Sequence, residues 1–433
     1  MNNISVIGLG KLGSSMAAAY ASKGHKVIGV DLNQAYVDAV NKAQAPVLET
    51  DLQKYITENK ERLSASTDYK TAISQSDITF IIVPTPSQED GVFSVKFAQS
   101  AAKEIGEALK GKNSFHLVVL TSTVLPQDCQ TQIIPLIEQH SGKKLDKDFG
   151  FCYSPEFIAL GSVIRDLLNP DFFLIGESEK NSGDILEAFY KTINSAAPVK
   201  RMSISSAELT KISLNHFLTM KITYANMLGE VAENIPGANI EDIVGAIGQD
   251  KRIGSKYLKS GLGFGGPCFP RDNRAFAAMA QNRGIKVPYA QATDSYNNSI
   301  VPRMLAKIKK YANPESKIAI IGLSYKPSTA FAEESQAVAI ANKLSETGNK
   351  VNVFEPEGYF YAKPLLASGV VLTQNLAECL KDCDIIFLSN PGNRLEDLKA
   401  NLGNSKKVII DPWGQFKVSD FDANINYVPL GRG

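Results

Sequence analysis

Apolar residues fall into short runs that alternate with helical patterns at the two ends of the chain. Residues 3–33 begin with an apolar strand, pass through a Gly-Leu turn into a helix, and end in a second strand closed by an acid. Residues 316–356 repeat that order. A strand, helix and strand in this order pack as a right-handed parallel crossover. The pattern therefore predicts a βαβ unit at each end.

Two further runs support the repeat. Residues 76–86 (SDITFIIVPTP) and 383–392 (CDIIFLSNPG) are unbroken apolar segments that stop at a proline. Such runs are typical of strands buried on both faces of a parallel sheet. We predict an α/β protein with two Rossmann-like, doubly wound parallel sheets, one at each end of the chain.

A long helix is predicted between the sheets, over residues 203–235. Its apolar positions recur at spacings of three and four, with Ser206 as the expected N-cap. No glycine or proline interrupts it before Gly229, and Pro236 and Gly237 end it. The helix can join the two sheets. Its broad apolar surface favours burial against a second copy of the chain, hence a homodimer; burial within one chain is the alternative.

Composition narrows the class of protein. Apolar residues make up 44% of the 433 and charged residues 21%, as in soluble globular proteins of two or three domains. The net charge of +1 gives no bulk attraction to nucleic acid or to an acidic membrane. The apolar run at the start is too short for a signal segment, and none approaches the roughly 20 residues of a membrane helix. We expect a cytoplasmic protein.

The five cysteines are scattered and odd in number, which indicates reduced thiols in a chain without a secretion signal. Cys379 and Cys383 lie four residues apart on an expected helix. No second pair of Cys or His accompanies them, so we predict buried thiols and no metal site.

The first turn has the composition of a dinucleotide-binding loop, Gly8-Leu9-Gly10-Lys11-Leu12-Gly13, and Asp31 ends the next strand. Gly8 permits a tight turn, Gly10 lets the backbone approach a pyrophosphate, and Gly13 lets the helix meet the strand. The helix N-terminus supplies N–H donors. Because Asp31 would repel a 2′-phosphate, NAD⁺ is favoured over NADP⁺. The second half keeps only Gly322, so we expect that sheet to hold another ligand.

A second glycine-rich loop precedes Cys268, in the sequence GLGFGGPCFPRD at 261–272. Glycine at this density lets the backbone close around a ligand. Cys268 could be a packing residue, but Arg271 and Asp272 follow it and could set the ionisation of its thiol. With a dinucleotide site in the same chain, a covalent step on an aldehyde is chemically sensible.

At this loop the chain resembles the UDP-glucose/GDP-mannose dehydrogenase family, nearly from end to end. The motifs that carry the resemblance are the glycine-rich start, VPTP (83–86), STV (122–124), SPEF (154–157), AELTKISLNHFL (207–218), RIG (252–254), GFGGPCFPRD (263–272) and GLSYKP (322–327). The resemblance implies two Rossmann-like domains joined by a helix on which dimers form. We expect an NAD-binding domain at 1–202, a central domain with the cysteine loop at 203–300, and a nucleotide-sugar-binding domain at 301–433.

The resemblance also implies roles for individual residues. Cys268 is the expected nucleophile, Lys211 and Asn215 donate to the developing oxyanion, and Asp272 handles protons near the thiol. Glu156 and Thr123 are expected to place the hydrolytic water. Expected NAD contacts beyond the first loop and Asp31 are Thr85, Thr123 and Arg271. Expected contacts to the nucleotide sugar are Glu156, Phe157, Lys211, Asn215, Arg252, Tyr257, Leu258, Lys259, Phe264, Gly265 and Lys326.

The implied reaction removes two hydrides from C6 of the sugar, giving the uronate through a Cys268 thiohemiacetal and thioester. UDP-glucose is the first expected substrate, with UDP-N-acetylhexosamine and GDP-mannose as alternatives. The chain departs from the family pattern where charges are expected, at Leu160, Phe172, Glu333 and Trp413. Loss of three arginines weakens anion binding, so a degenerate nucleotide-sugar-binding protein is the alternative of another class.

Overall fold

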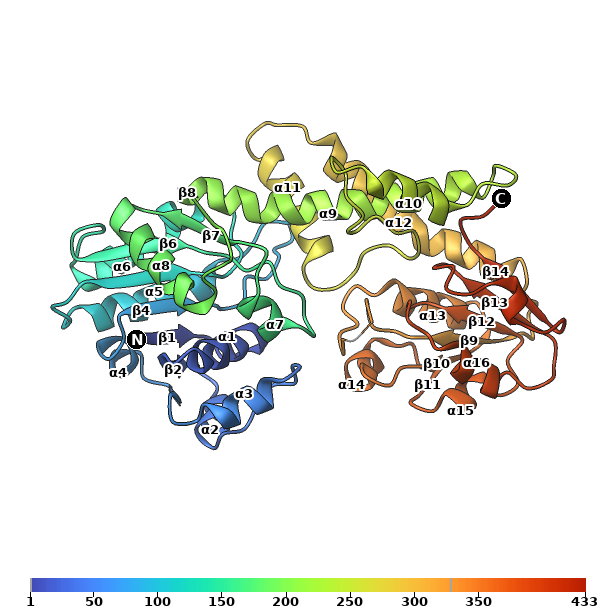
Figure 1. Cartoon of the computed structure of the whole chain (residues 1–433), viewed down its shortest axis with the longest axis horizontal. Helices are drawn as coiled ribbons and strands as arrows, with labels where there is room; N and C mark the ends of the chain where they lie inside the picture. The colour runs from blue at the N-terminus through green and yellow to red at the C-terminus, as the bar shows by residue number, and fades with distance from the viewer. Residues whose placement is uncertain (1, 328) are drawn as a thin grey trace. The chain divides into compact units, whose positions relative to one another are not determined.

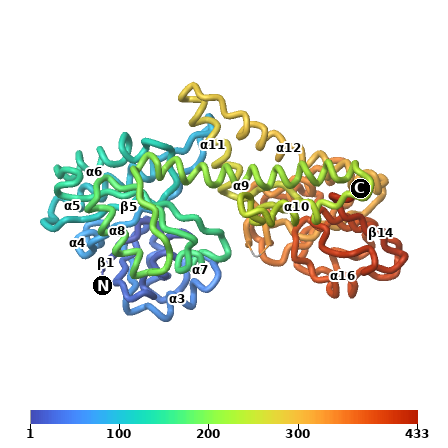
Figure 2. The backbone as a smooth tube through the Cα atoms, turned by 45° about the horizontal axis from the view of Figure 1, so that its top comes forward, coloured from blue at the N-terminus to red at the C-terminus, as the bar shows by residue number. Residues whose placement is uncertain are grey.

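The computed structural model describes residues 2–327 and 329–433. Its contacts divide the chain into two units, Met1–Ser213 and Leu214–Gly433, which are taken in turn (Figure 1). The boundary falls inside one helix, α9 (Ile204–Ala232), which Figure 2 shows running on from the first unit. The predicted division into three segments remains a prediction.

The first unit contains an eight-stranded sheet in the order β3-β2-β1-β4-β5-β6-β7-β8. Neighbouring strands are parallel except for the antiparallel pair β6 and β7. The order reverses between β1 and β4, which is the switch point where ligands bind in such sheets. The strands are β1 (Asn3–Ile7), β2 (Lys26–Val30), β3 (Leu63–Ser66), β4 (Ile78–Ile81), β5 (His116–Leu120), β6 (Phe149–Tyr153), β7 (Phe173–Glu177) and β8 (Val199–Ser203).

Both faces of this sheet are covered by helices. On β4, Phe80 packs in the core with α1 and α8, whereas its neighbour Ile81 packs with α4, α5 and α6. Successive strand residues point to opposite faces, so apolar runs without alternation are what two covered faces require. The helices are α1 (Lys11–Ser22), α2 (Gln34–Asn41), α3 (Leu52–Glu58), α4 (Tyr69–Ser74), α5 (Lys96–Leu109), the π-helix η1 (Cys129–Ile133), α6 (Ile134–Ser141), α7 (Val163–Leu168) and α8 (Lys180–Ile193).

The second unit contains a six-stranded, fully parallel sheet in the order β11-β10-β9-β12-β13-β14. This order matches that of the first six strands of the other sheet, which confirms the predicted fold of two Rossmann-like sheets. The strands are β9 (Lys317–Ile321), β10 (Lys350–Phe354), β11 (Val370–Thr373), β12 (Ile385–Leu388), β13 (Lys407–Asp411) and β14 (Ile425–Pro429).

Helices α12 and α13 pack on one face of the second sheet, and α15 and α16 on the other. The helices of this unit are α10 (Ile240–Gln249), α11 (Phe269–Gln281), α12 (Pro288–Lys309), α13 (Gln336–Glu346), α14 (Tyr359–Ala362), η2 (Lys363–Leu365), α15 (Leu376–Leu380), α16 (Leu395–Asn401) and η3 (Val418–Asp420).

The predicted internal repeat is confirmed in detail. In each half, the first strand is followed by a glycine of positive φ, and the next residue donates its N–H to the acid that closes the second strand. The two sets are Gly8 (φ +98°) with Leu9 N 2.6 Å from Asp31 Oδ2, and Gly322 (φ +96°) with Leu323 N 2.7 Å from Glu355 Oε2.

The long helix was predicted to start with Ser206 as its N-cap, and this was wrong. The helix begins at Ile204, and Ser203 Oγ accepts the N–H of Ser206 at 3.3 Å. Ser203 ends β8, so the strand feeds directly into the helix and the serine at the junction takes the capping role. No helix in residues 2–327 and 329–433 is long and apolar enough to cross a bilayer.

Candidate active site

The dinucleotide loop lies at the carboxyl end of β1, beside the switch point. A Cβ on Gly13 would lie 1.8 Å from the carbonyl oxygen of Gly8, so only glycine lets α1 approach the turn this closely. At Gly10 a Cβ would meet nothing within 4 Å, which leaves that side of the backbone open to a ligand. Gly10 also provides no side-chain cap for α1. The first N–H groups of the helix can therefore bind the pyrophosphate of a dinucleotide.

Asp31 is fixed by two backbone donors at the end of β2. Its Oδ2 accepts the N–H of Leu9 at 2.6 Å and its Oδ1 accepts that of Asn33 at 2.8 Å. Each carboxylate oxygen has a second lone pair for a ribose hydroxyl, whereas a 2′-phosphate would be repelled. The residues of this turn therefore fit NAD⁺.

The loops that follow β4 and β5 are joined beside the same edge. Thr85 is buried, and its hydroxyl donates to the carbonyl oxygen of Thr123 at 2.7 Å. Ser122 Oγ accepts the N–H of Val83 at 2.9 Å and donates to its carbonyl oxygen at 2.7 Å. These bonds bring the predicted cofactor residues Thr85 and Thr123 together.

A residue that sequence reasoning missed ties the Thr123 loop to α9. The carboxylate of Glu208 is fully buried and accepts the N–H groups of Gln127 at 2.7 Å and Cys129 at 3.0 Å. Glu208 lies three residues before Lys211. An acid on the buried side of a helix is the one signal in the sequence that could have singled it out.

Lys211 and Glu156 lie together in the first unit. Lys211 Nζ donates to the backbone carbonyl of Glu156 at 2.6 Å and lies 4.9 Å from the ring centroid of Phe157. Burial raises the pKa of the Glu156 carboxyl to about 7, and the nearby Lys211 ammonium opposes that rise. A carboxyl with this pKa can exchange a proton near neutral pH.

One of the departures from the family pattern, Phe172, lies next to this group, and another, Leu160, lies in the core of the same unit. The ring of Phe172 packs at 5.0 Å from that of Phe157, and Leu160 packs against the apolar core. Phe172 therefore supports the aromatic ring beneath Lys211, where an arginine would have brought a second cation.

The nucleophile candidate belongs to the second unit. Cys268 is the exposed member of the five cysteines, and the other four are buried. It is the N-cap residue of α11. A helix N-terminus carries partial positive charge and stabilises an anion such as a thiolate.

Asp272 lies fully buried one turn after Cys268. Asn215 Nδ2 donates to its Oδ2 at 2.6 Å, and Arg271 Nε donates to its Oδ1 at 2.9 Å. Asn215 is on α9, four residues after Lys211. The structure thus joins Asn215, Arg271 and Asp272 in one group, and Lys211, Glu156 and Phe157 in another, on a helix that both units share.

The predicted sugar-nucleotide residues of the second unit differ in how far their side chains are exposed. Leu258 and Phe264 are buried, whereas Arg252, Tyr257 and Lys259 are exposed. Arg252 pairs with its neighbour Asp250 at 2.6 Å. A Cβ on Gly265 would lie 2.5 Å from the carbonyl oxygen of Glu334, and Lys326 is partly buried beside Tyr325.

The loop before Cys268 is supported by side chains that the sequence did not reveal. Asn226 on α9 accepts the N–H of Gly261 at 2.8 Å and donates to the carbonyl of Leu262 at 3.2 Å. The indole of Trp413 covers Gly261, where a Cβ would lie 2.2 Å from the ring, and its Nε1 donates to Ser389 O at 3.0 Å. Trp413 therefore packs on the cysteine loop. The remaining departure, Glu333, is exposed.

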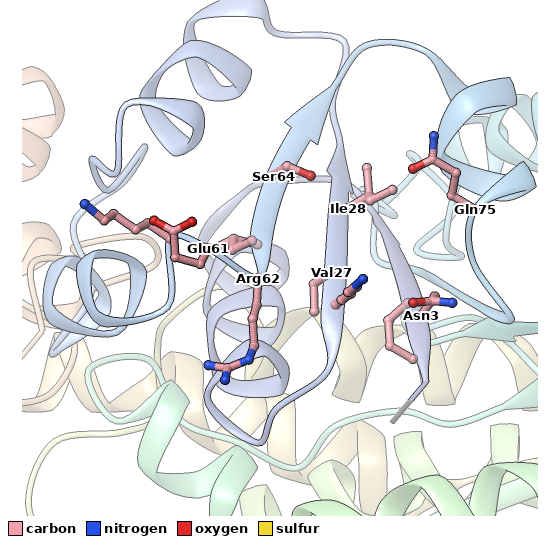
Figure 3. A pocket seen from close by; sticks show the side chains of 11 residues that line it. Asn3, Val27, Ile28, Glu61, Arg62, Ser64 and Gln75 are labelled. Carbon is pink, nitrogen blue, oxygen red and sulfur yellow. The ribbon is translucent and has the colours of Figure 1, made fainter.

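A hollow of about 280 Å³ lies elsewhere, at the amino ends of β1, β2 and β3 (Figure 3). Asn3, Val27 and Arg62 are among the residues that line it, and none of the predicted site residues does. Ligands of parallel α/β sheets bind at the carboxyl ends of the strands, so we assign the hollow no part in the chemistry. Within the described residues, no group of His, Cys, Asp and Glu side chains could hold a metal ion.

Comparison with known proteins agrees with this arrangement. Three models of the UDP-glucose/GDP-mannose dehydrogenase family match the chain: the NAD binding domain at residues 2–194, the central domain at 205–299 and the UDP binding domain at 319–418. The GDP-mannose 6-dehydrogenase of Pseudomonas aeruginosa is 32% identical over 94% of this chain and 95% of its own length. The UDP-glucose 6-dehydrogenase AglM of Haloferax volcanii is 33% identical over 97% and 94%.

A solved structure extends the agreement to the fold. A UDP-glucose dehydrogenase from Pyrobaculum islandicum superposes with a TM-score of 0.90 at 28% identity, covering 100% of this chain and 98% of the other. Family models over most of the length, relatives above 30% identity and a geometry suited to NAD⁺ point the same way. The chain belongs to the UDP-glucose/GDP-mannose dehydrogenase family and is an NAD-dependent nucleotide-sugar 6-dehydrogenase.

Proposed function

We propose that this enzyme oxidises UDP-glucose at C6 to the uronate, with Cys268 as the covalent nucleophile. The observation that carries the proposal is the exposed thiol of Cys268 at the N-terminus of α11, one turn before the buried carboxylate of Asp272, which accepts hydrogen bonds from Asn215 and Arg271. A single active site would then serve both oxidation steps.

The proposed reaction is RCH₂OH + 2 NAD⁺ + H₂O → RCOO⁻ + 2 NADH + 3 H⁺. NAD⁺, when bound, accepts the hydride in each oxidation. The Cys268 thiolate adds to the aldehyde carbon and forms the C–S bond of a thiohemiacetal, while the carbonyl π bond breaks and its oxygen takes up a proton. Loss of the second hydride from that carbon, together with the hydroxyl proton, leaves a thioester. Water attacks the thioester, the C–S bond breaks, and the thiolate is regenerated.

We assign the remaining catalytic roles to residues of both groups. Lys211 and Asn215, four apart on α9, would donate hydrogen bonds to the developing oxyanion. Asp272 would handle the proton near the thiol. Glu156, with Thr123, would place and deprotonate the hydrolytic water, a role that a carboxyl of pKa about 7 can perform at neutral pH.

We assign NAD⁺ to the turn from Gly8 to Gly13 with Asp31, Thr85, Thr123 and Arg271. For the nucleotide sugar we propose Arg252, Tyr257–Lys259, Phe264, Gly265 and Lys326, together with Glu156, Phe157, Lys211 and Asn215. Lys259 and Lys326 would neutralise the diphosphate. In this proposal residues 1–202, 203–300 and 301–433 act as cofactor, central and nucleotide-sugar domains.

The choice of sugar and base needs an experiment, because relatives of nearly equal identity are named for different substrates. Their names divide between GDP-mannose and UDP-glucose 6-dehydrogenases. The test is a panel of UDP-glucose, UDP-N-acetylhexosamines and GDP-mannose with NAD⁺. We expect the highest kcat/KM with UDP-glucose, and a higher value with either alternative would overturn that choice.

A nucleotide-sugar-binding protein without turnover is the alternative of another class. An exposed acid at Glu333 and an indole at Trp413, in place of expected arginines, favour it. Calorimetry separates the two functions. Binding of a nucleotide sugar without binding of NAD⁺, and no NADH from the whole panel, would support the binding protein.

We also propose a homodimer formed along α9. Phe217, Tyr224, Met227 and Val231 remain exposed at spacings of seven, three and four residues, so they share one side of the helix. Sedimentation should give a dimer for the wild type and a monomer for a Phe217→Glu, Tyr224→Glu variant. A wild type that sediments as a monomer would contradict the proposal.

A further inference from the structure

The backbone of residues 263 and 264 in the cysteine loop is hydrogen-bonded by two side-chain amides from other parts of the chain. Asn297, buried on α12, accepts the N–H of Phe264 through Oδ1 at 2.9 Å and donates through Nδ2 to the carbonyl oxygen of Phe264 at 3.0 Å. One side chain thus pairs both polar groups of a single residue. Both backbone groups of the buried Phe264 are therefore paired. An unpaired N–H or C=O group in the interior would destabilise the fold.

Gln336 at the start of α13 completes the support. Its Oε1 accepts the N–H of Gly263 at 2.7 Å, and its Nε2 donates to the backbone carbonyl of Asn297 at 3.0 Å. The two amides therefore contact the loop at adjacent residues, and Gln336 Nε2 also lies 3.4 Å from Asn297 Oδ1. We call Asn297 and Gln336 the amide clamp.

The clamp explains why glycine stands at position 263. A Cβ there would lie 2.1 Å from Asn297 Oδ1 and 2.4 Å from Gln336 Nε2, closer than atoms can approach. The next two glycines are also covered: a Cβ on Gly265 would meet the carbonyl of Glu334 at 2.5 Å, and one on Gly266 would meet the ring of Tyr325 at 2.6 Å. Other parts of the second unit therefore pack closely against the loop at Gly263, Gly265 and Gly266.

We propose that Asn297 and Gln336 are positioning residues, which hold the loop so that the thiol of Cys268 meets the aldehyde carbon before the aldehyde escapes. The inference rests on the proposed function, because it concerns capture by Cys268. Small misplacements of a reacting group cost large factors in rate. The first hydride transfer does not use the thiol, so loosening the clamp should impair capture and the second oxidation more than the first.

The test compares Asn297→Asp and Gln336→Met with wild type. Asn297→Asp keeps the shape and the acceptor for the Phe264 N–H but loses the donor to its carbonyl. Gln336→Met keeps the length and loses the acceptor for the Gly263 N–H. Gln336→Glu is the conservative variant, because it restores that acceptor. Asn298→Ala is the matched control, since Asn298 is the exposed neighbour on α12 and its amide contacts Asp294.

For Asn297→Asp and Gln336→Met we expect kcat for the full oxidation to fall at least tenfold with KM changed less than threefold. The NADH yield should fall below two per sugar, with aldehyde trapped by semicarbazide. Amide exchange in residues 261–266 should rise at least tenfold while the β9–β14 peptides keep wild-type rates. Gln336→Glu should recover part of the yield, and Asn298→Ala should match wild type.

Wild-type exchange in the loop, or a full yield of two NADH without aldehyde at wild-type kcat, would overturn the inference. If one variant fails to fold, the other carries the test, because each removes a different bond. Failure of the proposed function looks different: wild type itself would release no NADH from any nucleotide sugar. The exchange measurement would then decide whether the clamp fixes the loop.

Discussion

Asn215 donates a 2.6 Å hydrogen bond to the buried carboxylate of Asp272, which joins two helices across 57 positions of sequence. The second oxygen of Asp272 is held by Arg271 at 2.9 Å. A buried charge is stable only when it is paired and hydrogen-bonded in this way. The result is a carboxylate of fixed orientation one turn from the proposed nucleophile.

Asp272→Asn should therefore lower kcat by about 100-fold or more, the scale of a lost proton-transfer group. The variant keeps the shape but loses the charge that Arg271 faces. Steady-state kinetics with NAD⁺ and the preferred nucleotide sugar measure the change. Asp242→Asn, an exposed acid on α10, is the control. Turnover of Asp272→Asn within threefold of wild type would argue against any role in proton handling.

The pKa of Glu156 makes a prediction for the pH profile. Burial raises this pKa to about 7, so the carboxyl is protonated below pH 7 and becomes a base as the pH rises through 7. If thioester hydrolysis limits turnover, kcat should rise with pH and level off above pH 7. Glu156→Gln should lose this rise, with kcat lowered by about 100-fold.

The matched control for that experiment is Glu58→Gln, an exposed acid at the end of α3. It should keep the wild-type profile. If kcat of the wild type rose near the ordinary carboxyl pKa, or if Glu156→Gln kept the wild-type rise of kcat with pH, Glu156 would have no role in the hydrolytic step.

Asp31 is predicted to set the preference for NAD⁺ over NADP⁺. Asp31→Asn removes the negative charge that repels a 2′-phosphate, although its amide oxygen can still accept one of the two backbone N–H groups. We expect the ratio of kcat/KM for NAD⁺ to that for NADP⁺ to fall about tenfold, or about 1.4 kcal/mol. Asp38→Asn, exposed on α2, serves as control. An unchanged ratio would mean that other groups discriminate.

His116 predicts how stability depends on pH. The ring is buried on β5, with Lys112 Nζ donating to Nδ1 at 3.0 Å, so Nε2 carries the proton toward Thr79 at 2.7 Å. Burial, aided by Lys112, lowers the pKa of His116 to about 3. Between about pH 6.5 and pH 3 the unfolded chain binds a proton that the folded chain does not.

The free energy of unfolding should therefore decrease as the pH is lowered through that window, by about 1.4 kcal/mol per pH unit from this residue. Urea unfolding at pH 7, 6 and 5 measures the slope. His116→Gln should flatten it, whereas His140→Gln, partly exposed on α6, should not. Equal slopes in wild type and His116→Gln would contradict the assignment.

The fold could be predicted because its signals are local. Unbroken apolar runs mark strands covered on both faces, and the Gly8 and Gly322 turns keep the same order in both halves. The antiparallel pairing of β6 with β7 could not be predicted, because no short-range pattern records which way a strand returns. The helix cap was misplaced by three residues because serines stand at 203, 205 and 206, and only the geometry selects among them.

For the site, the sequence indicated the reactive residues but not what holds them. Cys268 and its glycines stand out by composition. That Gly261 is covered by Trp413, and Gly263 by Asn297 and Gln336, depends on contacts between distant parts of the chain. Likewise Glu208 contacts a loop about 80 residues earlier. No regular spacing in the sequence relates these supporting residues to the residues they contact, so only the folded structure identifies them.

Capture of the aldehyde by Cys268 is the step on which the proposed four-electron oxidation depends. The direct measurement is the number of NADH formed per nucleotide sugar by wild type and Cys268→Ser, with Cys383→Ser as control, since a serine there can still donate to Cys379 O as the thiol does. We predict two for wild type and the control, and at most one, with released aldehyde, for Cys268→Ser. A Cys268→Ser enzyme that still yields two NADH at the wild-type rate would contradict the account.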